Sequence, residues 1–211
     1  MGETKYEKWG ALAGIEFVVL ILVGAFIGGT PPKLSDSAEK ITKYYADNQD
    51  ALKVGNVLAG LSLIAFLWFL GTLFGRLRRA EGGSGRVSGI ALTGGVAVTA
   101  IAAVAYAINA YGVVYPGGGD GSFRISSIVF GYLGFAAAAF VLGSSIVVLR
   151  TQLLPAWVAW LGGINALLWI IGGVVVSSTK DVWGYFGLAA FLSWALWIVV
   201  VSVLLYQKQD A

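Results

Sequence analysis

Long apolar stretches alternate with shorter polar ones along the whole chain. Six stretches approach or exceed about 20 mostly apolar residues, the length that an α-helix needs to cross a bilayer. They are residues 9–27, 54–75, 87–111, 125–149, 156–177 and 183–206. Most connections are short, so consecutive helices are expected to pack as antiparallel neighbours. The pattern predicts an all-α fold, with residues 1–211 forming one polytopic membrane bundle of six transmembrane helices.

The segment between the first two spans has a polar pattern of its own. Pro31 and Pro32 are expected to end the first helix, because proline lacks an amide donor. Asp36, followed three residues later by Glu39, resembles a capping box at a helix start. The apolar residues that then recur near helical spacing are Ala38, Ile41, Tyr45 and Leu52. We therefore expect an amphipathic helix over residues 37–52 on the extracytoplasmic surface, acting either as a lid or as a helix packed on the bundle.

Basic residues indicate the orientation of the spans. Four arginines lie within residues 76–86, the short connection after the second span. Short loops rich in Lys and Arg stay in the cytoplasm. An even number of spans then places both termini in the cytoplasm, and the expected location is the cell (inner, cytoplasmic) membrane.

Composition narrows the classes of function. The chain is 58% hydrophobic and 12% charged, whereas soluble domains carry about 25% charged residues. The net charge of +3 resides mainly beside apolar segments, so nucleic acid is not an expected partner. With no cysteine and no histidine, thiol chemistry, the usual zinc sites and Ser-His or Cys-His catalysis are excluded. We expect no catalytic, cofactor-binding or metal-binding residue, and no enzyme activity.

One carboxylate within the spans is a candidate functional group. Glu16 lies about 10 Å past Trp9 along the first helix, at 1.5 Å per residue. A carboxylate in lipid needs a partner, a water path or a proton. The residues expected at a similar depth from the cytoplasmic side are Thr93, Ser144, Ser145 and Asn165. This polar layer is either a site for a proton, cation or small polar ligand, or a hydrogen-bond network that joins helices.

A second polar group is expected near the outer face. Its members are Asn56, Asn109, Arg124, Ser126 and Ser127. The group either binds an anion or lipid head group beneath the amphipathic helix, or leaves Arg124 to reach up to the head groups by itself.

Small residues predict how the helices associate. Three glycine pairs have GxxxG spacing: Gly10 and Gly14, Gly24 and Gly28, and Gly71 and Gly75. Such pairs let helix backbones approach closely in lipid. We expect contacts within the chain, with a homo-oligomer as the alternative.

The first 90 residues resemble a class of bacterial six-helix integral membrane proteins common in high-GC Gram-positive bacteria. The resembling residues are 35–41, 44–48, 69–71 and 76–82. Some members of this class are similar to the DUF4386 group. The resemblance implies a short outer helix after the first span and an arginine-rich inner loop after the second, and it implies no site.

Two classes of function remain open. The first is a small channel, transporter, or lipid- or small-ligand-binding membrane protein that uses the polar layer at Glu16. The second is an accessory or scaffolding subunit of a larger membrane complex. Membrane lipids are expected partners in both classes, and a membrane-protein partner in the second.

Overall fold

The fold is known from a computed structural model, which describes residues 2–115, 117–176 and 182–208, and the side chains of 8–115, 117–176 and 184–208. Its long helices are α1 (Gly2–Phe26), α3 (Gln49–Glu81), α4 (Arg86–Val114), α5 (Gly119–Thr151), α6 (Ala156–Val175) and α7 (Val182–Gln207). All six are long and apolar enough to cross a membrane. The chain is therefore a multi-pass integral membrane protein, and the predicted all-α bundle of six spans is confirmed.

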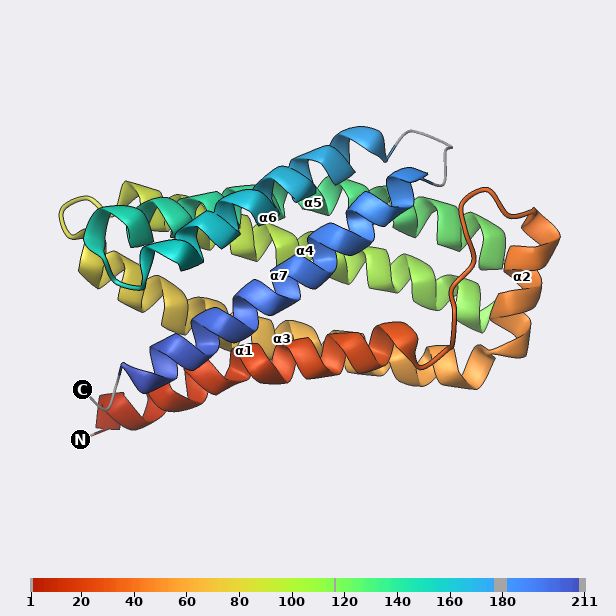
Figure 1. Ribbon diagram of the computed structural model, residues 1–211. Coiled ribbons are helices and arrows are strands. Elements are labelled where there is room, and N and C mark those ends of the chain that lie inside the picture. The colour runs from red at the N-terminus through yellow and green to blue at the C-terminus, as the bar shows by residue number, and fades with distance from the viewer. Residues whose placement is uncertain (1, 116, 177–181, 209–211) are drawn as a thin grey trace.

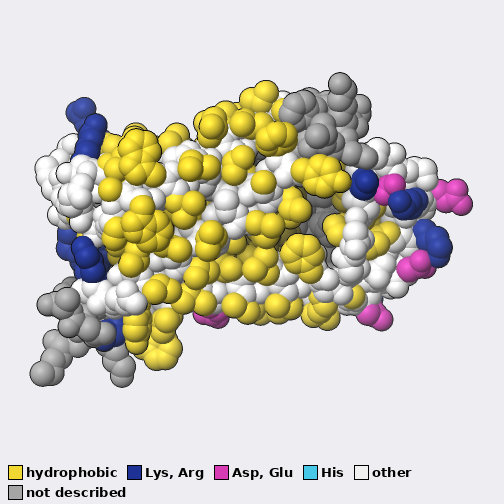
Figure 2. Space-filling model, in the orientation of Figure 1, with side chains coloured by type: hydrophobic (Ala, Val, Ile, Leu, Met, Phe, Trp, Pro, Cys, Tyr) yellow, Lys and Arg dark blue, Asp and Glu magenta, His cyan; other side chains and the backbone are white. Residues whose placement is uncertain are grey.

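The six long helices form a closed ring. Each packs against the next in the order α1, α3, α4, α5, α6, α7, and α7 returns to α1. Both termini lie at one end of the bundle, and the short helix α2 (Ala38–Asp47) crosses the opposite end (Figure 1). Charged side chains gather at the two ends, with an apolar belt between them (Figure 2). We call these the arginine-loop end, after residues 76–86, and the α2 end.

Aromatic side chains fill the middle of the ring. Phe66 on α3 contacts Phe17 on α1, Phe140 on α5 and Trp194 on α7, with ring centroids 5.0–5.7 Å apart. Phe140 also meets Trp197 edge-on at 5.7 Å. None of these five side chains is more than 4% exposed. Because interiors pack densely in low-energy rotamers, this cluster leaves little free space at the level of Phe66.

Glycines bring α1 close to α3, as the GxxxG pairs predict. A Cβ built on Gly24 would lie 2.9 Å from the carbonyl oxygen of Gly55, and one built on Gly55 would lie 2.7 Å from that of Gly24. Gly10 and Gly14 likewise face side chains of the bundle, including Thr72 and Phe69 of α3. Contacts within the chain are thus confirmed for these glycines. Gly71 differs, because a Cβ there would meet no atom within 4 Å.

Several helices extend beyond the apolar segments that predicted them. α3 begins at Gln49 rather than at residue 54 and ends at Glu81 rather than at 75, while α5 begins at Gly119 rather than at 125. The first span, expected to end at residue 27, ends at Phe26. Residue 177, the expected end of the fifth span, lies outside the described residues. Hydropathy locates the part of a helix in lipid, but hydrogen-bonded caps decide where the helix ends.

The outer amphipathic helix is shorter than predicted, and its cap is different. α2 ends at Asp47, and residues 49–52 belong to α3. Asn48 separates the two helices, because its backbone leaves the helical region and its side-chain amide donates to the Tyr44 carbonyl at 2.9 Å. The N-cap is Ser37, whose hydroxyl accepts from the Lys40 amide, and not Asp36. The helix packs on the end of the bundle, chiefly on α5.

Candidate ligand cavity at the α2 end

A cavity of about 270 Å³ lies at the α2 end of the ring, near the lower limit of about 300 Å³ for small-molecule sites. It is lined by Ile21, Gly24, Ala25, Pro31, Pro32, Tyr44, Tyr45, Leu52, Gly55, Asn56, Ala59, Tyr106, Asn109, Phe123, Phe130 and Phe191. Figure 2 shows a hollow in the apolar surface near this end. The lining residues come from every long helix except α6, and from α2 and the segment before it.

The chemistry of the lining is apolar and aromatic, with a few polar groups. Six of the lining residues are Tyr or Phe, and none is Lys, Arg, Asp or Glu. The polar atoms belong to two amides, Asn56 and Asn109, and to three phenols. Burying a charged group without a partner is costly. Such a cavity therefore suits an uncharged molecule that is mostly apolar and carries one or two hydrogen-bonding groups.

The two amides are placed differently. Asn109 on α4 donates from its side chain to the hydroxyl of Tyr45 on α2, at 2.8 Å. Burial, helped by the neighbouring Tyr44, raises the pKa of Tyr45 to about 12, so this phenol stays protonated at neutral pH. Asn56 on α3 forms no hydrogen bond with any residue in the described part of the chain. A primary amide offers two donors and an acceptor, so Asn56 is available to a bound molecule.

Residues 27–37 and α2 together cover the cavity, and we call them the roof. Gly29, with φ of 77°, turns the chain after α1, and Pro31 and Pro32 then keep it from continuing as helix. Ile41 and Tyr45 of α2 are buried against Val113 of α4. The roof therefore consists of a non-helical segment after α1 and of the short amphipathic helix α2, which buries its apolar face on the bundle.

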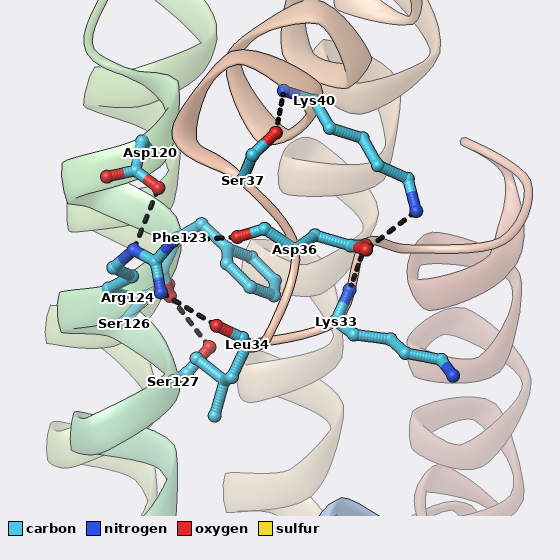
Figure 3. A network of polar contacts seen from close by, with 10 residues as sticks. All are labelled: Lys33, Leu34, Asp36, Ser37, Lys40, Asp120, Phe123, Arg124, Ser126 and Ser127. Atoms are coloured by element: carbon cyan, nitrogen blue, oxygen red, sulfur yellow. Dashed lines mark hydrogen bonds and ion pairs between the residues drawn. The ribbon is translucent and has the colours of Figure 1, made fainter. Parts of the chain in front are cut away.

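Arg124 on α5 holds the roof in place. Its guanidinium donates to the carbonyl oxygens of Leu34 at 2.7 Å and Asp36 at 3.0 Å, both on the segment that precedes α2 (Figure 3). It also donates to the Asp120 carboxylate at 2.8 Å, one turn earlier on α5. The side chain of Arg124 is 39% exposed. Its planar group of five donors suits this simultaneous contact with three oxygens.

The Asp36 carboxylate organises the start of α2. It accepts from the Lys33 amide at 2.9 Å and from the Lys40 ammonium at 2.7 Å (Figure 3). The hydrogen bond from Lys40, followed by that from the Lys33 backbone, holds the pKa of Asp36 below its usual value of 3.8. The carboxylate thus joins the segment before α2 to the first turn of the helix.

The structure brings together part of the outer polar group expected from the sequence. Asn56 and Asn109 line one cavity, as their shared depth suggests. Arg124 does not line it, and its guanidinium is bonded to Asp120 and to two backbone carbonyls. Ser126 and Ser127 both donate to the carbonyl of Phe123 within their own helix. The cationic member of the group therefore supports the roof.

The residues expected to form an inner polar layer are divided between surface and interior. Glu16 and Thr93 are exposed, and Thr93 donates to carbonyls of its own helix. Ser144, Ser145 and Asn165 are buried. Asn165 donates to the Ala190 carbonyl and the Ser193 hydroxyl at 2.8 and 2.7 Å, which joins α6 to α7. Ser144 donates to Phe140 of its own helix, and none of the hydrogen bonds of the described residues joins these five side chains to one another.

Sequence reasoning missed the aromatic residues of the cavity. Tyr106, Phe130 and Phe191 lie within predicted spans, where aromatic residues are common and carry no positional signal. The one available signal was Tyr106, whose hydroxyl lies within a span otherwise rich in alanine and glycine. A buried phenol usually has a polar environment nearby.

The chain matches no known family model, no curated protein and no solved structure. The resemblance to bacterial six-helix membrane proteins therefore stays a prediction, and the geometry of the site carries the functional argument.

Proposed function

We propose that this membrane protein binds an uncharged, mostly apolar small molecule or lipid in the cavity at the α2 end. The observation that carries the proposal is the composition of the cavity: six aromatic residues, no charged side chain and two amides around about 270 Å³. Apolar pockets with a few well-placed polar groups are the usual form of small-molecule sites. Asn56 and Asn109 would fix the orientation of the ligand.

The membrane setting determines the source of the ligand. We infer from the positive-inside rule that the arginine-loop end, with both termini, faces the cytoplasmic side of the cell membrane. The cavity then opens at the level of the outer leaflet, where a lipid or a membrane-dissolved molecule is concentrated. An anionic head group is a poorer ligand, because no Lys or Arg lines the cavity and the nearby Arg124 is already bonded to three oxygens.

The proposal is for binding without catalysis. Among the described residues, no group of three or more Asp, Glu, His or Cys side chains could hold a metal ion. The polar side chains that line the cavity are phenols and amides. None of the lining side chains is a carboxylate, imidazole or amine, the groups that usually act as general bases.

Native mass spectrometry of protein gently extracted from its own membrane tests the proposal. The wild-type protein is expected to retain an uncharged adduct. Ala25→Phe should remove it, because Ala25 lines the cavity and a phenyl ring would fill part of its volume. Asn56→Leu should lower the occupancy about fivefold, as expected for one lost hydrogen bond.

Ala103→Phe is the matched control, because Ala103 is exposed on α4 and does not line the cavity. Equal retention of the adduct by Ala25→Phe and by the control would contradict the proposal. So would a retained anionic phospholipid that depends on Arg124 and not on Asn56.

A further inference from the structure

Glu16 lies in an apolar stripe on the outer face of α1. Its neighbours one turn away, Leu12 and Val19, are 37% and 54% exposed, and Val23 in the next turn is 49% exposed. Glu16 is itself exposed, and it forms no hydrogen bond or ion pair with the described residues. We call Leu12, Glu16, Val19 and Val23 the Glu16 stripe.

The position of Glu16 along α1 places its carboxylate within the apolar part of the membrane. Eight residues separate it from Lys8, the last charged residue before it in the sequence, which is about 12 Å of helix at 1.5 Å per residue. Ten residues, or about 15 Å, separate it from Phe26 at the other end. The short glutamate side chain cannot cover either distance to reach the head groups. A carboxylate at this depth is costly unless another group pairs with it.

The packing of α1 does not allow Glu16 to turn inward. The opposite face of the helix carries Gly10 and Gly14, where an added Cβ would collide with Thr72 of α3 and with Phe69 of α3 and Ser202 of α7. Rotating α1 to bury Glu16 would replace these close glycine contacts with larger side chains. The carboxylate must therefore find its partner outside this chain.

A second copy of this chain fits the stripe poorly. Both copies insert with the same orientation, so a symmetric contact through this face would place Glu16 against Glu16 at one depth. Two carboxylates in an apolar setting disfavour each other's charge. The stripe also carries no glycine to allow a close approach, since Gly10 and Gly14 face the bundle.

We propose that the Glu16 stripe is a docking surface for a membrane-spanning helix of a different protein, which places a Lys or Arg at the depth of Glu16. Opposite charges attract strongly where the dielectric constant is low, and pairing removes the cost of leaving each charge alone in lipid. Leu12, Val19 and Val23 supply the apolar contact around the pair. This inference concerns the outer face of α1 and is independent of the cavity.

Photo-crosslinking in the membranes of cells that naturally make the protein tests this inference. A benzoylphenylalanine is placed at Val19 in the stripe, and at Trp160 on α6, which is 67% exposed, as the control. The expected product at Val19 is an adduct to a spanning peptide of another protein that contains Lys or Arg. Glu16→Gln, which keeps the size of the side chain, should lower the yield about tenfold or more, as expected on losing a charge-assisted bond.

Three results would overturn the inference: an adduct at Val19 no more abundant than at Trp160, an adduct to a second copy of this chain, or a yield unaffected by Glu16→Gln. The last would mean that the charge of Glu16 does not hold the partner helix. Unchanged thermal unfolding of Glu16→Gln would exclude misfolding as the cause of a lost adduct. Restoration of crosslinking by Glu16→Lys together with a Glu in place of the partner's basic residue would identify the pair.

Discussion

Arg124→Ala is expected to free the roof from the bundle without unfolding the bundle. The substitution removes the bonds from Arg124 to the carbonyls of Leu34 and Asp36, which in the described part of the chain are its only hydrogen bonds to the roof. Hydrogen bonds made by charged groups contribute about 1.5–3 kcal/mol each, and less where water competes. Because the Arg124 side chain is 39% exposed, we take about 1 kcal/mol for each bond, the usual contribution of an uncharged hydrogen bond. Loss of both should favour local opening of α2 by about 2 kcal/mol, or about 30-fold.

Amide hydrogen exchange measures this local opening directly. The amide of Ile41, which donates to the Ser37 carbonyl at 3.1 Å, reports on the first turn of α2. In Arg124→Ala its protection should fall about 30-fold, while amides beside Phe140 in the middle of α5 stay protected. Asp120→Ala should have a smaller effect, since Asp120 bonds to Arg124 and not to the roof.

Arg150→Ala serves as the matched control, because it also removes one arginine from α5. Arg150 is exposed in the last turn of α5, at the opposite end from the roof. A loss of less than about threefold in α2 protection on Arg124→Ala, or an equal loss on Arg150→Ala, would refute the assigned role of Arg124.

Three further results are expected. Gly24→Ala should lower the unfolding temperature by several degrees, because its Cβ would lie 2.9 Å from a backbone oxygen of α3, whereas Gly60→Ala, which meets no atom within 4 Å, should not. The folded-state pKa of Asp36 lies below 3.8, so its stabilisation of α2 is present above pH 3.8 and is lost as the pH falls through the folded-state pKa. Exchange of α2 amides should accelerate as the pH falls through that range, and Asp36→Asn should abolish this pH dependence. Since the chain has no cysteine, Ser84→Cys and Glu39→Cys should react with an impermeant maleimide from opposite sides of the membrane.

The spans could be predicted because lipid imposes a strong and simple requirement on sequence. The end of α2 could not, because Ile41, Tyr45 and Leu52 continue a helical spacing across Asn48, where the helix stops. Only the local bonds of Asn48 to the Tyr44 carbonyl reveal the break. Helical periodicity shows which face of a segment is apolar. It does not reveal a break in the helix when the apolar residues on both sides of the break keep the same spacing.

The candidate site was only partly accessible to sequence reasoning. Asn56 and Asn109 were identifiable as amides at one depth, but their shared cavity depends on how α3 and α4 pack. The direction of Glu16 followed from the helix itself: at about 100° per residue, Glu16 lies about 200° from Gly14. The face opposite a packing glycine points outward, and this geometry separates Glu16 from the buried members of the expected polar layer.

The filled core favours binding over conduction. A pore through the ring would have to pass the level of Phe66, where Phe17, Phe140 and Trp194 surround its ring with centroids 5.0–5.7 Å away. These side chains come from α1, α5 and α7. Opening a path would therefore move α1, which its glycines hold close to α3 and α7. The roof, by contrast, is attached through a few polar contacts and one small apolar cluster around Ile41. Movement of the roof is therefore the less costly change, and it would widen access to the cavity.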